Sequence, residues 1–225
     1  MAEGHRQRVR DRLLSQRVQD VPEYVVLESY LHGIVPRKDM HALANRLIDE
    51  FGTFAQVVDA PLESLMAVDG VGQTIAQKIK LLQVYLRGYL HSKNKVDNVL
   101  YTTEDFGEYL KPYFLGERNE LVYLLCMNAS HKVLGCDFLG EGGVAAVSFT
   151  LRNLLTVATK YNATKVVLAH NHPCGVAIPS QEDIAITRRI KNILQDSEII
   201  LLDHLIMDGD DFVSIRDTGG VVSIW

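Results

Sequence analysis

The sequence predicts an α/β domain, a mixed sheet sandwiched with helices, preceded by a small all-α domain. Apolar residues recur at helical spacing through residues 22–91, which indicates helices in the first part of the chain. Beyond residue 98, short β-branched and apolar runs alternate with helical patterns, as in a mixed sheet covered by helices. The polar stretch 92–98 predicts a linker, so that the all-α domain covers residues 1–95 and the α/β domain residues 99–225.

Length and charge bound the class of protein. The 225 residues, 47% of them hydrophobic, can bury one sizeable core or two small ones. The net charge of -5 argues against a generic nucleic-acid binder, and it is uneven: residues 1–98 hold 13 basic and 12 acidic side chains, residues 99–225 hold 10 and 16. Three cysteines without a C-x-x-C pair, no long apolar run and a polar amino terminus predict a cytoplasmic protein without disulfides or membrane contact.

The first domain is predicted to contain five helices, at 22–35, 39–51, 54–59, 61–67 and 74–91. Ahead of them, arginines at positions 6, 8, 10 and 12 alternate with other residues. This pattern is typical of solvated surface or a loose arm. The more specific alternative is an arm that contacts phosphates.

Two glycines lie between the last two of these helices. Gly70 and Gly72 permit a tight turn that exposes backbone N–H groups at a helix start, where a phosphate can bind. Lys78 and Lys80 follow as possible phosphate partners. The turn resembles a helix-hairpin-helix motif, which implies that this domain binds DNA. A helical hairpin used only for packing or protein contact is the alternative, and the near-neutral charge of this half leaves both open.

The second domain is predicted to begin with a helix capped by Thr102 and reaching about Tyr113. Strands are predicted at 120–127, 132–138, 144–149, 165–169, 198–202, 205–207 and 212–215. A helix over residues 150–161 and another beginning at Ser180 complete the pattern. The Asp208-Gly209 step predicts a hairpin turn between the last two strands.

The segment HNHPCGVAIPSQED, residues 170–183, is the most informative in the chain. His170 and His172 end a buried strand, where alternation places both imidazoles on one side of the sheet. Asp183 lies one turn into the next helix, so the strand end and the helix start can bring two imidazoles and a carboxylate together. Three such ligands with a fourth position left for water are typical of catalytic zinc. Ser180 and Asp183 also form a capping box, which by itself requires no metal.

The pattern H-x-H-x7-S-x2-D resembles the motif of JAMM (MPN-type) metalloproteins, and HNHPCG followed by PSQED resembles the signature of the RadC family. The resemblance extends to Leu202-Asp203-His204 and to the amino-terminal half. It implies a metallopeptidase or isopeptidase in which a zinc-bound water attacks an amide. His170, His172 and Asp183 would be the zinc ligands, and Ser180 the donor to the oxyanion. His204 is expected to be a core histidine and not a ligand.

The same resemblance implies that Glu120 is the acid/base, since the family places a glutamate at the head of an upstream strand. Two departures stand out. Asn153 occupies a position where the family usually has glutamate, which leaves open whether the hydrolase is active, and Cys174 replaces a usual serine. The alternative function is a DNA-associated repair or recombination accessory protein whose metal is structural or acts on nucleic acid. Expected partners are therefore a peptide or protein substrate, with DNA possible through the first domain; the sequence does not give the oligomeric state.

Overall fold

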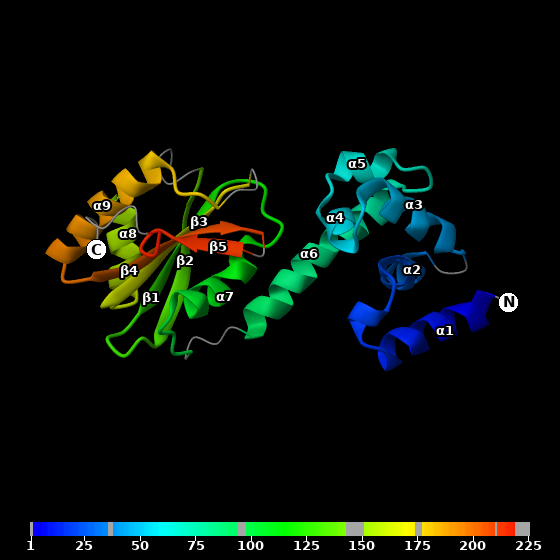
Figure 1. Ribbon diagram of the computed structural model, residues 1–225, viewed down its shortest axis with the longest axis horizontal. Helices are drawn as coiled ribbons and strands as arrows, with labels where there is room; N and C mark the ends of the chain where they lie inside the picture. The colour runs from blue at the N-terminus through cyan, green and yellow to red at the C-terminus, as the bar shows by residue number, and fades with distance from the viewer. Residues whose placement is uncertain are drawn as a thin grey trace. The chain divides into compact units, whose positions relative to one another are not determined.

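The computed structural model describes residues 2–35, 38–93, 98–142, 151–173, 177–209 and 211–218. The chain divides into two compact units, Met1–Leu86 and Arg87–Trp225 (Figure 1). The division lies inside helix α6 (Gln73–Lys93), ahead of the stretch that the sequence predicts as a linker. The last turns of this helix therefore belong with the second unit.

The described part of the first unit is helical. It contains the five predicted helices, within a few residues of their expected bounds: α2 (Glu23–Ile34), α3 (His41–Phe51), α4 (Phe54–Asp59), α5 (Leu62–Ala67) and α6. Thr53 caps α4 through a reciprocal capping box with Gln56, which fixes where that helix begins. The core is aliphatic, and its fully buried members include Leu27, Leu31, Leu47, Leu65 and Ile79.

The expectation of a loose amino-terminal arm is wrong, because residues Ala2–Ser15 form helix α1. A short 3-10 helix (Val18–Asp20) connects α1 to α2. Val9 and Leu13 of α1 pack with Val21 and Val25 in a small apolar cluster. The arginines at positions 8, 10 and 12 are exposed, so the predicted solvated surface is present on an ordered helix.

The second unit is built on a five-stranded mixed sheet in the order β2-β1-β3-β4-β5. Strands β3 and β4 run parallel, and the other neighbouring pairs are antiparallel. This confirms the predicted α/β class. The elements are α7 (Thr103–Phe114), β1 (Leu121–Met127), β2 (Val133–Glu141), α8 (Leu151–Lys160), β3 (Lys165–Asn171), α9 (Gln181–Asp196), β4 (Ile200–Asp208) and β5 (Asp211–Ser214).

Two strand predictions differ from the structure or fall outside it. The strands expected at 198–202 and 205–207 are one continuous strand, β4. Its register with β3 shifts between Leu201 and Asp203, so Leu202 is an extra residue at a bulge. The bulge and the polar pair Asp203-His204 interrupt the apolar alternation on which the two-strand prediction depended. The strand predicted at 144–149 lies outside the described residues.

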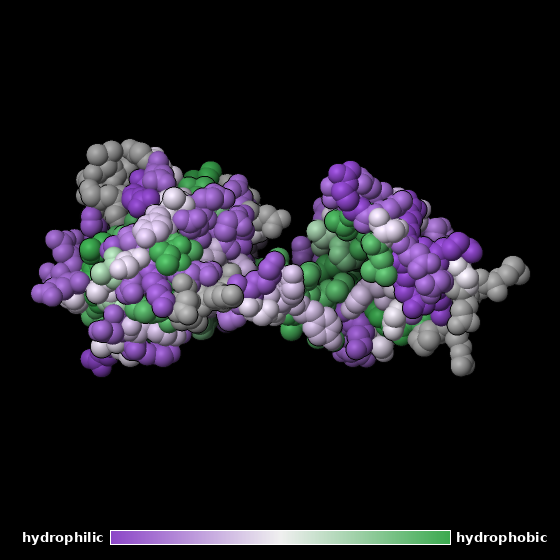
Figure 2. All heavy atoms as spheres, turned by 90° about the horizontal axis from the view of Figure 1, so that it is seen from below, coloured by the Kyte–Doolittle hydropathy of each residue, from purple (hydrophilic) through white to green (hydrophobic). Residues whose placement is uncertain are grey.

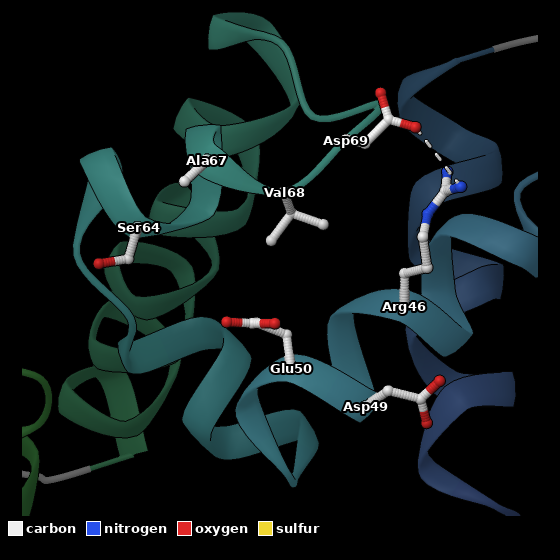
Figure 3. A pocket seen from close by; sticks show the side chains of 7 residues that line it. All are labelled: Arg46, Asp49, Glu50, Ser64, Ala67, Val68 and Asp69. Atoms are coloured by element: carbon white, nitrogen blue, oxygen red, sulfur yellow. Dashed lines mark ion pairs between the residues drawn. The ribbon is translucent and has the colours of Figure 1, made fainter.

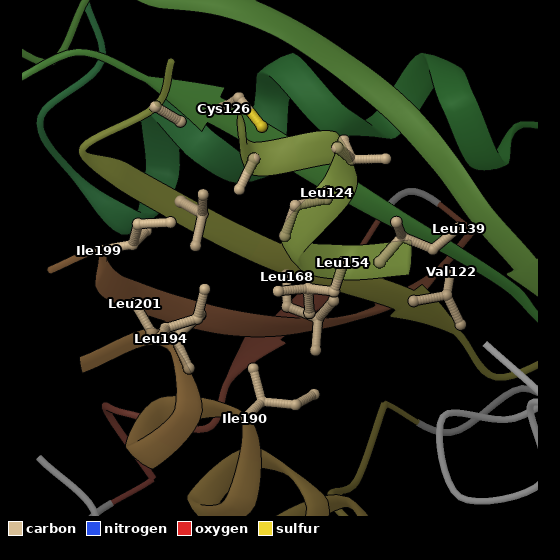
Figure 4. Close-up of a cluster of buried hydrophobic side chains, with 14 residues drawn as sticks. Val122, Leu124, Cys126, Leu139, Leu154, Leu168, Ile190, Leu194, Ile199 and Leu201 are labelled. Atoms are coloured by element: carbon tan, nitrogen blue, oxygen red, sulfur yellow. The ribbon is translucent and has the colours of Figure 1, made fainter. Parts of the chain in front are cut away.

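Each face of the sheet has its own apolar core. On one face, Val122 and Leu124 of β1 and Leu168 of β3 pack against Leu154 of α8 and Ile190 of α9 (Figure 4). On the other face, alternate residues of the same strands pack against α7. The arrangement is a helix–sheet–helix sandwich, and the face covered by α8 and α9 also carries the candidate site.

Hydrophilic residues cover most of the surface seen in Figure 2, with smaller hydrophobic areas between them. Among the described residues, no helix combines the length and apolar character needed to cross a membrane.

Candidate metal centre

Strand β3 and helix α9 bring the predicted ligands together. His170 is the next-to-last residue of β3, and His172 follows directly after the strand. Asp183 lies in the first turn of α9 and, like His170, is buried. Because Val122, Leu168 and His170 alternate onto the α8 and α9 face, the imidazole of His170 is directed toward the start of α9.

The three donor groups have the spacing of a tetrahedral metal site. The Nε2 atoms of His170 and His172 are 3.0 Å apart. Asp183 places Oδ1 3.2 Å from Nε2 of His170 and Oδ2 3.6 Å from Nε2 of His172. Zinc with bonds of 2.0–2.1 Å separates its tetrahedral ligands by about 3.3–3.4 Å. The predicted set His170, His172 and Asp183 therefore fits one small cation, and it is one of three His and carboxylate groups among the described residues with such convergence.

A buried chain of hydrogen bonds orients His170. Thr187 Oγ1 donates to the carbonyl of Asp183 at 2.5 Å, so its oxygen accepts from Nδ1 of His204, also at 2.5 Å. The Nε2 atom of His204 is then an acceptor, and the Nδ1–H of His170 donates a hydrogen bond to it at 2.8 Å. This leaves the lone pair of His170 on Nε2, facing the other ligand atoms.

His204 is thus a core histidine and stands outside the ligand set, but it contacts the site through His170. It is fully buried on β4, and burial lowers its pKa well below the ordinary value, with the charge of His170 acting in the same direction. A neutral His204 is what the hydrogen-bond chain requires. The hydrogen bond between His204 and His170 was not predicted, because the two residues are 34 positions apart in sequence.

The carboxylate of Asp183 is held in its charged form. Burial raises its pKa, but the hydrogen bond and charge of a His170 that is protonated at Nε2, with hydrogen bonds from Ser180, outweigh burial and lower the pKa well below the usual value. A divalent cation needs the same ionised carboxylate, and it would take the place of the Nε2 proton of His170.

Ser180 is the N-cap of α9. Its Oγ accepts from the backbone N–H of Asp183 at 3.1 Å, and Oδ2 of Asp183 accepts from the backbone N–H of Ser180 at 2.8 Å. The capping box is therefore present together with the candidate ligand set. The hydroxyl of Ser180 also donates to Oδ2 of Asp183 at 2.5 Å, which orients the carboxylate.

Glu120 directly precedes β1, the strand that pairs with β3 next to the candidate site. Val122 pairs with His170 at the end of the ladder, and the same antiparallel register continued by two residues would set Glu120 opposite His172. If the alternation of β1 extends to Glu120, its side chain lies on the same face as Val122, and its role at the site stays a prediction from the sequence. The amide of Asn171 secures this end of β1, because Oδ1 accepts from the N–H of Leu121 at 2.7 Å and Nδ2 donates to the carbonyl of Asn119 at 3.0 Å.

Asn153 donates from Nδ2 to the carbonyl of Leu139 at 3.1 Å, so it joins α8 to β2. Cys174 lies outside the described residues.

The predicted phosphate-binding turn lies in an acidic setting. Gly70 has φ of 92°, as the tight turn requires, and both Gly70 and Gly72 are exposed. A hollow beside the turn is lined by Asp49, Glu50 and Asp69, with Arg46 paired to Asp69 at 3.7 Å (Figure 3). Lys78 is exposed, whereas Lys80 Nζ donates to the carbonyl of Val58 at 2.7 Å. DNA binding by this unit stays a prediction from the sequence.

The sheet, its covering helices and the convergent His170, His172 and Asp183 define an α/β domain with a candidate metal site of JAMM type. A comparison with family models matches residues 100–220 to the RadC-like JAB domain. The chain therefore belongs to the RadC family.

Proposed function

We propose that the protein is a zinc-dependent hydrolase of peptide or isopeptide bonds. The observation that carries the proposal is the spacing of 3.0, 3.2 and 3.6 Å among the ligand atoms of His170, His172 and Asp183. Two imidazoles and one carboxylate are a donor set of catalytic zinc sites, which keep a fourth position open. When bound, zinc supplies Lewis acidity that activates water and polarises an amide carbonyl.

The protein groups divide the remaining work. Glu120, at the head of β1, takes the proton of the attacking water on its carboxylate and returns it to the leaving amine nitrogen. Ser180, whose hydroxyl donates to Oδ2 of Asp183 in this structure, would redirect that proton to the oxygen that gains negative charge. Burial of His170 and Asp183 limits access of bulk water to their side of the site, which strengthens electrostatic interactions there.

The first experiment measures zinc in the untagged protein and in His172→Ala by elemental analysis after reconstitution. We expect the parent to bind about one equivalent more than the variant, because one of three ligands is lost. Equal zinc contents would overturn the proposal.

Hydrolysis is then tested on a panel of linear peptides and isopeptide-linked substrates. Glu120→Gln should keep its zinc and lose at least about 100-fold in rate, because the proton acceptor is removed. Glu182→Gln is the matched control: Glu182 is an exposed carboxylate next to Asp183 and should be dispensable. If Glu120→Gln retains the parent rate, Glu120 is not the base.

A further inference from the structure

A second convergence of imidazoles and carboxylate lies in the first unit, around Glu28 of α2. The side chain of Glu28 is 1% exposed. His5 of α1 places Nε2 2.6 Å from Oε1, and His41, the first residue of α3, places Nδ1 2.9 Å from Oε2. His32, one turn along α2, has Nε2 3.7 Å from Oε1. Each carboxylate oxygen thus faces an imidazole nitrogen from a different helix.

A buried carboxylate needs a cation or strong hydrogen-bond donors. Within the described part of the chain, the ion pairs of Glu28 are all with histidines. The neighbouring Arg6 instead donates through Nη2 to the carbonyl of Lys38 at 2.9 Å. His5 and His41 can meet this need by donating N–H hydrogen bonds at 2.6 and 2.9 Å, or by holding a bound cation against the carboxylate. Neutral imidazoles with a carboxylate are good ligands for a divalent transition-metal ion.

We propose that His5, Glu28 and His41 form a second metal site, which takes a divalent cation of the zinc class. Their ligand atoms all lie within 4.8 Å of one another, so modest side-chain rotations would bring them to the roughly 3.3–3.4 Å that separates the ligands of one zinc ion. His32 lies close enough to the same carboxylate to be a further donor.

A metal ion at this site would attach helix α1 to the helices beside it. His5, Val9 and Leu13 are spaced four residues apart and share one face of this helix. Val9 and Leu13 give this face only a small apolar cluster with α2 and the preceding segment. An ion held by His5 would tie the first turns of α1 to α2 through Glu28 and to the start of α3 through His41. The site is therefore structural, and binding adds to the stability of the folded unit.

The test uses the full-length, untagged chain in the His172→Ala background, which weakens the site of the second unit. Zinc binding is measured by equilibrium dialysis and elemental analysis. We expect this variant to keep about one equivalent, and the triple variant His172→Ala/His5→Ala/His41→Ala to bind at least about 100-fold more weakly, since two of three ligands are lost. His172→Ala/His91→Ala is the control, because His91 is an exposed helical histidine outside the cluster.

Hydrogen exchange supplies a local readout. Zinc should slow exchange of the α1 amides in His172→Ala and leave them unchanged in the triple variant. Substituting the buried Glu28 risks unfolding the unit, so the more exposed His5 and His41 are the informative positions. If His172→Ala binds no zinc, or binds it equally after both substitutions, the cluster is a hydrogen-bonded clamp only and the proposed site is overturned. Parent protein with His5→Ala/His41→Ala should still load the site at His170, which separates this outcome from failure of the proposed hydrolase.

Discussion

His170 can present Nε2 to a cation only while its Nδ1 atom carries the proton, and two residues secure that arrangement. Nε2 of His204 accepts a hydrogen bond from the Nδ1–H of His170. Thr187 accepts from Nδ1 of His204 and so keeps the proton of His204 on Nδ1. Both are fully buried, so water does not compete for these hydrogen bonds. The orientation of the first ligand therefore depends on a hydroxyl on α9, one turn beyond Asp183.

Thr187→Val should weaken zinc binding at this site by about 10–100-fold, because His204 loses its acceptor and can adopt the wrong tautomer. Valine has a similar shape, so the helix should remain folded, at a cost of about 1–3 kcal/mol for the buried imidazole N–H left without a partner. Competition with a chromogenic chelator in the His5→Ala/His41→Ala background measures the affinity of this site alone.

Thr156→Val is the matched control for that substitution. Thr156 makes the same kind of bond on α8, from Oγ1 to the carbonyl of Arg152 at 2.8 Å, and it is exposed. Its substitution should leave zinc affinity unchanged. Equal affinities for both valine variants and the parent would contradict the orienting role of Thr187.

Cys126 of β1 is predicted to be unreactive in the folded protein. Burial raises the pKa of its thiol to about 12, and the nearby charge of Asp137 acts in the same direction. Because the thiolate is the reactive form, iodoacetamide at pH 8 should leave Cys126 unmodified, while denatured protein reacts readily. Peptide mass spectrometry measures both. Modification of the native protein at the denatured rate would show that β1 opens locally.

The ligands could be predicted from the sequence, whereas the residues that orient them could not. His170, His172 and Asp183 lie within one strand–loop–helix segment, so their spacing already limits how they can meet. His204 and Asn171 act on groups that lie 34 and 50 residues away in sequence. Their roles depend on the pairing of β3 with β4 and with β1, which periodicity does not encode.

At the scale of elements, the predictions of secondary structure fail where the apolar periodicity is weak or interrupted. Helix α1 has a strongly polar sequence, and its His5, Val9 and Leu13 face gives little helical periodicity. In β4, Asp203 and His204 interrupt the apolar run, but both are satisfied inside the fold. Asp203 accepts from Ser214 at 2.9 and 2.8 Å and from Thr103 at 3.2 Å. His204 forms hydrogen bonds with His170 and Thr187. Long-range hydrogen bonding therefore permits a polar pair within a buried strand.

Gly107 allows α7 to pack closely on the sheet. A Cβ atom at this position would overlap the ring of Phe212 on β5. Gly107→Ala should therefore destabilise the second unit by about 1–3 kcal/mol, although alanine favours a helix interior by roughly 1 kcal/mol over glycine. Chemical denaturation with and without the substitution measures the difference.

Gly88→Ala in α6 is the control, since Gly88 is exposed and a Cβ there meets no atom within 4 Å. It should be neutral or stabilising by up to about 1 kcal/mol. A stabilising effect of Gly107→Ala similar to that of Gly88→Ala would mean that Phe212 moves aside without cost.

For the whole molecule, the two units have separate cores. Leu47 belongs to the apolar cluster of the first unit and Leu168 to a cluster of the second, and the clusters share no residue. Elements unfold together when they bury side chains in the same core. Because the two units have separate cores, each should unfold without requiring the other to unfold. Helix α6 crosses the division, which makes its middle turns the place where coupling would be transmitted.

Leu47→Ala and Leu168→Ala should each cost about 2–5 kcal/mol, because both side chains are fully buried and their removal leaves a cavity. Native-state hydrogen exchange should show Leu47→Ala lowering protection in α2, α3 and α5 while β1 and β3 keep theirs. Leu168→Ala should give the reverse pattern. Loss of protection in both units from either substitution would show that α6 makes them one cooperative body, and zinc bound in one unit would then also stabilise the other.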